Sequence, residues 1–159
     1  MSETRPNVLL VIPAGKEAQQ ATRAALDLAK ARGGTLVALV VLDPAVSTRA
    51  ASALSDVGFM GEELSEQVEA TLRDEYRAGA EALLRALVEQ AKRDLTRITP
   101  LIEQGDASEI CGRVIDAHAV GVAVLVAEKH SWLTRFLAHD AAVQLPALSG
   151  CEVRVMEED

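Results

Sequence analysis

The sequence predicts an α/β fold with three layers, in which helices cover both faces of a five-stranded, mostly parallel sheet. Short apolar runs recur along the chain, and Ala-rich segments with helical periodicity separate them. Alternation of strand and helix is typical of βαβ units, whose crossovers are right-handed. The 159 residues suit one domain with one core, and no internal repeat or linker divides residues 1–159.

The first βαβ unit is expected over residues 8–42. Residues 8–12 (VLLVI) form a continuous apolar run, typical of a strand buried on both faces, and Pro13 ends it. Residues 17–32 form an Ala-rich helix whose apolar positions recur at three- and four-residue steps, and Gly33 ends that helix. Residues 35–42 (TLVALVVL) form the second buried strand.

The middle of the chain is expected to hold a loop and the longest helix. Residues 45–61 have no clear period, so we interpret them as a surface loop, with a lid over a site as the alternative. Residues 62–93 have apolar side chains at helical spacing throughout. A third strand follows over residues 97–103, and Pro100 favours an edge position for it.

The last part of the chain supplies two more strands. Asp106, with Glu109 three residues later, predicts the start of a helix that runs to about residue 118. Residues 120–127 form a fourth buried strand. Residues 131–148 are broadly helical, and residues 151–156 alternate as a fifth strand.

Composition and charge exclude several kinds of partner. The net charge is −8 and the pI about 4.9, whereas a nucleic-acid-binding protein needs a basic surface. The acidic balance also argues against an anionic membrane surface, and no apolar stretch reaches the length of a membrane span. Two cysteines, Cys111 and Cys151, and an N-terminus without signal layout fit a reducing cytoplasm.

Several segments resemble the universal stress protein family, in the same order along the chain. The opening VLLVIPAG followed by LAKARGG, the glycine-acid turn GDASEI at residues 105–110, the segment WLTRFL at 132–137 and the ending GCEVRV at 150–155 carry the resemblance. It extends over nearly the whole chain and implies a Rossmann-like sheet, related to adenine-nucleotide α-hydrolases, with strand order 3-2-1-4-5.

The resemblance also implies where a ligand and a partner would bind. A nucleotide would lie at the carboxyl ends of strands 1 and 4, where open α/β sheets bind ligands. In this chain the candidate cleft residues are Pro13, Ala14, Gly15, Val41, Ala127, Lys129, His130 and Ser131. The family commonly forms homodimers through its last strands, which here would use Cys151, Val153 and Val155.

The phosphate-binding features of the ATP-binding members are missing from this sequence. Those members carry an acid in the loop after the first strand and a glycine pattern after the fourth, where glycines let backbone N–H groups approach phosphates. Here the loop is Pro13-Ala14-Gly15-Lys16, and no glycine lies between Gly121 and Gly150. We therefore expect a degenerate nucleotide site without ATP binding in the family manner.

The expected function is a non-catalytic regulatory or stress-response role, performed by a homodimer that contacts another protein and needs no cofactor. No nucleophile elbow, Walker loop or metal-binding histidine pair occurs, and the nine-residue step from His130 to His139 matches no zinc spacing. The alternative is a sensor that binds ATP, AMP or another small anion through Lys129, His130 and Ser131. An enzyme acting on adenylates has the least support.

Overall fold

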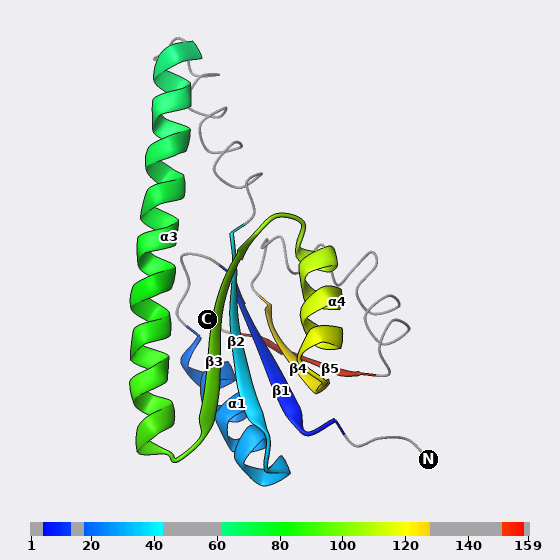
Figure 1. Ribbon diagram of the computed structural model, residues 1–159. Helices are drawn as coiled ribbons and strands as arrows, with labels where there is room; N and C mark the ends of the chain where they lie inside the picture. The colour runs from blue at the N-terminus through cyan, green and yellow to red at the C-terminus, as the bar shows by residue number, and fades with distance from the viewer. Residues whose placement is uncertain (1–4, 14–17, 43–61, 128–150, 158–159) are drawn as a thin grey trace.

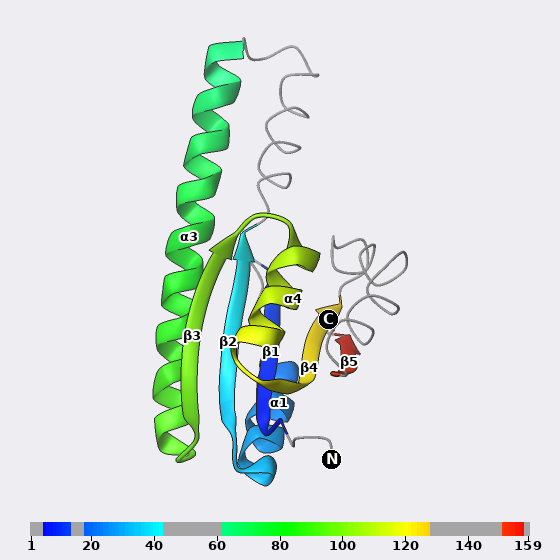
Figure 2. The same ribbon diagram turned by 45° about the vertical axis from the view of Figure 1, so that its right-hand side comes forward.

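The computed structural model describes residues 5–13, 18–42, 62–127 and 151–157 of the chain. In these ranges one five-stranded sheet has the order β3-β2-β1-β4-β5, and all its pairings are parallel. Helices lie on both faces of this sheet: α1 and α3 cover one face and α4 covers the other (Figure 1 and Figure 2). The strands are β1 (Asn7–Pro13), β2 (Thr35–Leu42), β3 (Arg97–Gln104), β4 (Val120–Ala127) and β5 (Glu152–Glu157), and the helices are α1 (Gln19–Arg32), α3 (Glu62–Arg93) and α4 (Ala107–Ala117).

The predicted fold class and strand order are confirmed, and the sheet is all-parallel in the described residues. The bounds predicted from the sequence agree with those of the described helices and strands to within two residues. Pro100 does lie on an edge strand, β3. The loop expected over residues 45–61 and the helix expected over residues 131–148 lie outside the described residues.

The core is built on the three central strands. Every residue from Val8 to Ile12 is fully buried, because helices cover both faces of β1. The inward face of α1 consists of small side chains, and Ala21, Ala25 and Ala29 have no exposed surface. Alanine at these positions lets the helix backbone approach the sheet closely.

An asparagine at the start of β1 connects the central strand to both of its neighbours. The Asn7 side-chain amide donates to the carbonyl of His118, which precedes β4, at 2.6 Å. Its Oδ1 accepts from the backbone N–H of Thr35, the first residue of β2, at 2.9 Å. These bonds fix the amino ends of the three strands relative to one another.

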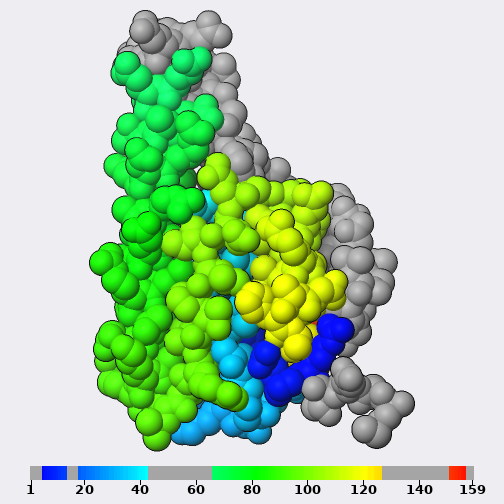
Figure 3. All heavy atoms as spheres, viewed as in Figure 1, coloured from blue at the N-terminus to red at the C-terminus, as the bar shows by residue number. Residues whose placement is uncertain are grey.

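Helix α3 extends beyond the sheet at its amino-terminal end (Figure 1 and Figure 3). Among the side chains of α3 that the structure describes, from residue 66 on, the buried ones lie in the second half of the helix: Ala80, Leu84, Leu87 and Ala91. The carboxyl-terminal half of α3 is therefore the part that contacts the sheet and α1. On the other face of the sheet, β3 and α4 form much of the surface (Figure 3).

Candidate functional site at the carboxyl edge of the sheet

The structure brings three of the predicted cleft residues to one edge of the sheet. Pro13 at the end of β1 pairs in register with Val41 on β2. Val11 on β1 pairs with Leu125 on β4, so Ala127, two residues further along β4, ends level with Pro13. The carboxyl ends of β1, β2 and β4 therefore lie side by side.

This edge includes the point where the strand order reverses. β1 has β2 on one side and β4 on the other, and α1 and α4 lie on opposite faces of the sheet (Figure 2). In open α/β sheets, ligands usually bind outside the carboxyl ends of the strands at such a point. The geometry thus places the candidate cleft between the ends of β1 and β4.

The described part of the cleft is apolar. Pro13 is buried, and Val41 has no exposed surface. These residues can shape a floor, whereas hydrogen bonds to a ligand would have to come from the segments that follow the strands. The other predicted cleft residues, Ala14, Gly15, Lys129, His130 and Ser131, lie outside the described residues.

An acidic side chain at the same edge of the sheet caps helix α4. Asp106 Oδ1 accepts from the Glu109 backbone N–H at 3.0 Å and from the Ser108 hydroxyl at 2.9 Å. These hydrogen bonds, the one from the Glu109 N–H first, lower the pKa of the Asp106 carboxyl below its usual value. The sequence correctly predicted this cap, which follows β3 and is separated from β1 by the whole width of β2.

The two thiols are buried, and neither forms a disulfide. Burial raises the pKa of Cys111 to about 12, with the nearby Asp106 carboxylate adding to the effect. Burial also raises the pKa of Cys151 to about 11. Both groups are therefore protonated at neutral pH, which suits a structural role for Cys111 and leaves Cys151 a poor nucleophile.

The predicted dimer strand, β5, lies at the edge of the sheet. Val155 is 47% exposed, Val153 is half-buried, and Cys151 just before the strand is only 3% exposed. Glu152 and Arg154 form an ion pair at 3.2 Å on the strand surface. Within the described residues, β5 pairs with β4 alone, so its other edge offers free backbone donors and acceptors.

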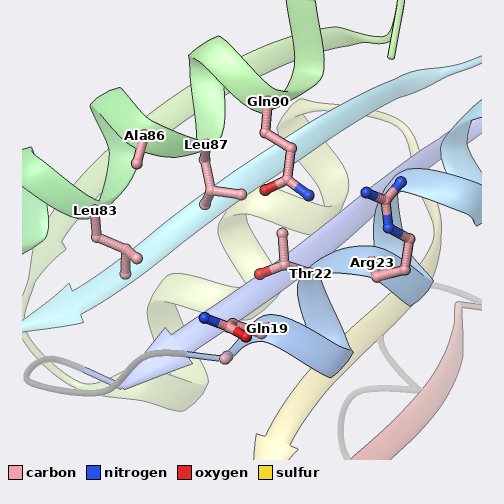
Figure 4. A pocket seen from close by; sticks show the side chains of 8 residues that line it. Gln19, Thr22, Arg23, Leu83, Ala86, Leu87 and Gln90 are labelled. Atoms are coloured by element: carbon pink, nitrogen blue, oxygen red, sulfur yellow. The ribbon is translucent and has the colours of Figure 1, made fainter. Parts of the chain in front are cut away.

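A second concave feature was not predicted from the sequence. A groove of about 410 Å³ lies between α1 and α3, and we call it the α1–α3 groove. Figure 4 shows the side chains that face it: Gln19, Thr22 and Arg23 on α1, with Leu83, Leu87 and Gln90 on α3. The available signal was Thr22, a hydroxyl beside the apolar stripe of α1, but only the packed structure identifies the residues opposite it.

Two further observations concern metals and membranes. Within the ranges described above, no group of three or more His, Cys, Asp or Glu side chains is arranged to hold a metal ion. Among the helices of those ranges, none combines the length and the hydropathy needed to cross a bilayer.

The all-parallel doubly wound sheet, whose strand order reverses at β1, defines a Rossmann-like α/β protein. A model of the universal stress protein family matches residues 4–156. This chain therefore belongs to the universal stress protein family.

Solved structures of universal stress proteins share the fold of this chain. A universal stress protein family member from Burkholderia pseudomallei is 20% identical, with a TM-score of 0.65 and coverage of 96% of each chain. UspA from Lactobacillus plantarum is also 20% identical, with a TM-score of 0.62, and the match covers 97% of this chain and 99% of that one. A universal stress protein solved in complex with cAMP is 15% identical, with a TM-score of 0.56 over 96% of this chain and 97% of that one. No curated protein matches the chain.

Proposed function

We propose that this chain is a non-catalytic regulatory protein of the stress response, which acts as a homodimer and does not bind ATP in the family manner. The observation that carries the proposal is the composition of the cleft. Its strand ends supply apolar surface, while the loop Pro13-Ala14-Gly15-Lys16 has no acid and no glycine occurs between Gly121 and Gly150. Without such glycines the backbone cannot approach a triphosphate closely, and Glu128 would repel it.

The absence of catalysis and the cellular location belong to the same proposal. Phosphoryl transfer needs metal-binding carboxylates beside a phosphate cradle, and the sequence after β1 and β4 offers no such combination. The two free, buried thiols fit a reducing cytoplasm. The protein then acts through contacts with its own second copy and with a further protein.

Thermal unfolding with ATP, AMP and Mg²⁺ tests the nucleotide part of the proposal. A ligand at 100 times its Kd stabilises the folded state by about 2.7 kcal/mol. For a chain of this size that corresponds to a Tm increase of about 5–10 °C. We expect no such increase with millimolar ATP or AMP, and inorganic triphosphate with Mg²⁺ serves as the control for ionic effects. A clear increase with a nucleotide but not with triphosphate would contradict the proposal.

A nucleotide or small-anion sensor is the second candidate, because one structural neighbour was solved with cAMP. In this chain Lys129, His130 and Ser131, together with residues 13–15, would hold the anion. The double substitution Lys129→Ala with Ser131→Ala should then abolish binding of ATP, AMP or cAMP in a calorimetric titration. Binding that survives this change would place the anion elsewhere.

A further inference from the structure

The α1–α3 groove lies outside the cleft at the strand ends and has a chemistry of its own. Its volume of about 410 Å³ is within the range of small-molecule sites. The first turns of α1 and the last third of α3 form its two walls (Figure 4). The inference drawn from it is independent of the function proposed above.

The hydroxyl of Thr22 faces this groove (Figure 4). Thr22 is only 6% exposed, and its hydroxyl makes no hydrogen bond to any residue in the described ranges. Thr71 on α3 shows the usual alternative, since its hydroxyl donates to the carbonyl of Gln67 four residues earlier at 2.9 Å. The Thr22 hydroxyl is not among the buried polar atoms of the described residues that lack a partner, so its oxygen is open to the groove and can form a hydrogen bond with a group that enters.

Two carboxamides face the same space from opposite walls. Gln19 on α1 and Gln90 on α3 both direct their side chains toward the groove (Figure 4). Each terminal amide has two N–H donors and one carbonyl acceptor, and neither forms a hydrogen bond with a described residue. The walls therefore offer donors and acceptors together.

The lining carries no uncompensated charge. Arg23 is the one charged side chain among the lining residues, and its guanidinium donates to the Asp94 carboxylate at 2.8 Å. The Asp27 carboxylate lies 3.9 Å from the same nitrogen of Arg23. A charged ligand would gain little from such a site, because these carboxylates already balance the cation.

We propose that the α1–α3 groove binds a neutral, polyhydroxylated small molecule of the monosaccharide or polyol class. Hydroxyl groups both donate and accept, which matches the donors and acceptors that Thr22, Gln19 and Gln90 present to the groove. The C–H face of such a ligand would pack on Leu83 and Leu87, which form the apolar part of the wall. A free planar base is a poorer match, because no aromatic side chain lines the groove for stacking.

Titration followed by two-dimensional ¹H–¹⁵N NMR tests this inference. The probes are D-ribose, D-glucose, myo-inositol and glycerol, added to the full chain up to millimolar concentrations. We expect at least one probe to cause saturable shifts of the Gln19 and Gln90 side-chain amides and of the Thr22 backbone amide. Thr22→Val, which keeps the shape of the side chain, and Gln90→Leu should each raise the Kd about 5- to 10-fold.

The neighbouring glutamine provides a matched control. Gln20 is exposed and does not line the groove, so Gln20→Leu should leave the Kd unchanged, whereas Gln19→Leu should raise it. The inference is overturned if none of the four probes causes saturable shifts at these residues. It is also overturned if Thr22→Val and Gln90→Leu both bind as well as the original chain, or if only inorganic phosphate shifts these residues.

Discussion

Two helices of this chain end in the same backbone geometry with different residues. Gly33 after α1 has φ 67°, and Leu95 after α3 has φ 57°. In both cases the next N–H returns to the helix: Gly34 donates to Ala29 and Thr96 to Ala91, each at 2.9 Å. A left-handed conformation suits glycine but costs about 1–2 kcal/mol for a residue with a Cβ.

Leu95→Gly should therefore stabilise the protein. The Leu95 side chain is 89% exposed, so little packing is lost on its removal. After the added backbone freedom of glycine in the unfolded chain is subtracted, we expect the free energy of unfolding to rise by about 0.5–1 kcal/mol. Gly33→Ala is the reciprocal control and should lower it by about 1 kcal/mol. Urea unfolding measures both, and a less stable Leu95→Gly variant would contradict the prediction.

The two thiols should be unreactive in the folded protein. Burial raises the pKa of Cys111 to about 12 and that of Cys151 to about 11, so at pH values near 8 almost none of either is thiolate. Reaction with a disulfide reagent should be at least about 100-fold slower than with free cysteine. Addition of urea past the unfolding midpoint should restore the fast reaction. Fast labelling of Cys151 with the fold intact would mean that this end of β5 opens.

At the scale of the element, the cap of α4 makes the stability of the protein depend on pH. The pKa of Asp106 is lower in the folded state, so its contribution is present above the unfolded value and is lost as the pH falls through the folded value. Asp106→Ala should lower the free energy of unfolding by about 1 kcal/mol at neutral pH. The difference should shrink below the usual aspartate pKa of about 3.9.

Asp106→Asn is the control for the cap itself, because asparagine also caps helices but does not titrate. This variant should stay close to the original stability at neutral pH and show a weaker loss in acid. Urea unfolding at neutral pH and near pH values of about 3 measures both variants. An equal loss for alanine at both pH values would show that the Asp106 charge does not matter.

The strands were easier to predict than the sites. Buried parallel strands are continuous apolar runs in the sequence, so β1, β2 and β4 could be predicted from it. Because these strands are parallel neighbours, their carboxyl ends at Pro13, Val41 and Ala127 meet at the same edge of the sheet. The α1–α3 groove could not be found in this way, because Thr22 and Gln90 are far apart in the chain and only packing brings their helices together. The place of Cys151 at a dimer interface stays a prediction, and in the single chain its thiol is buried just before β5.

At the scale of the whole molecule, the two edges of the sheet differ. The edge strand β3 contains Pro100, which has no backbone N–H and so weakens pairing with another strand. The opposite edge strand, β5 (EVRVME), has no proline and exposes Val155. An exposed edge with free backbone groups is a ready partner for a second chain. This contrast favours β5 as the edge through which the proposed homodimer forms.

Val155→Glu should then dissociate the dimer. In a two-fold symmetric pairing of β5 strands, the same short segment from both copies meets, so two added carboxylates come close together and repel each other. We expect the dimer Kd to rise at least about tenfold, which corresponds to about 1.4 kcal/mol, in sedimentation equilibrium. Leu95→Glu is the matched control, since Leu95 is also an exposed apolar side chain but adjoins β3 at the other edge of the sheet. If Leu95→Glu dissociates the dimer and Val155→Glu does not, the interface lies at the β3 edge instead. If the original chain is monomeric at micromolar concentration, the proposed homodimer is wrong.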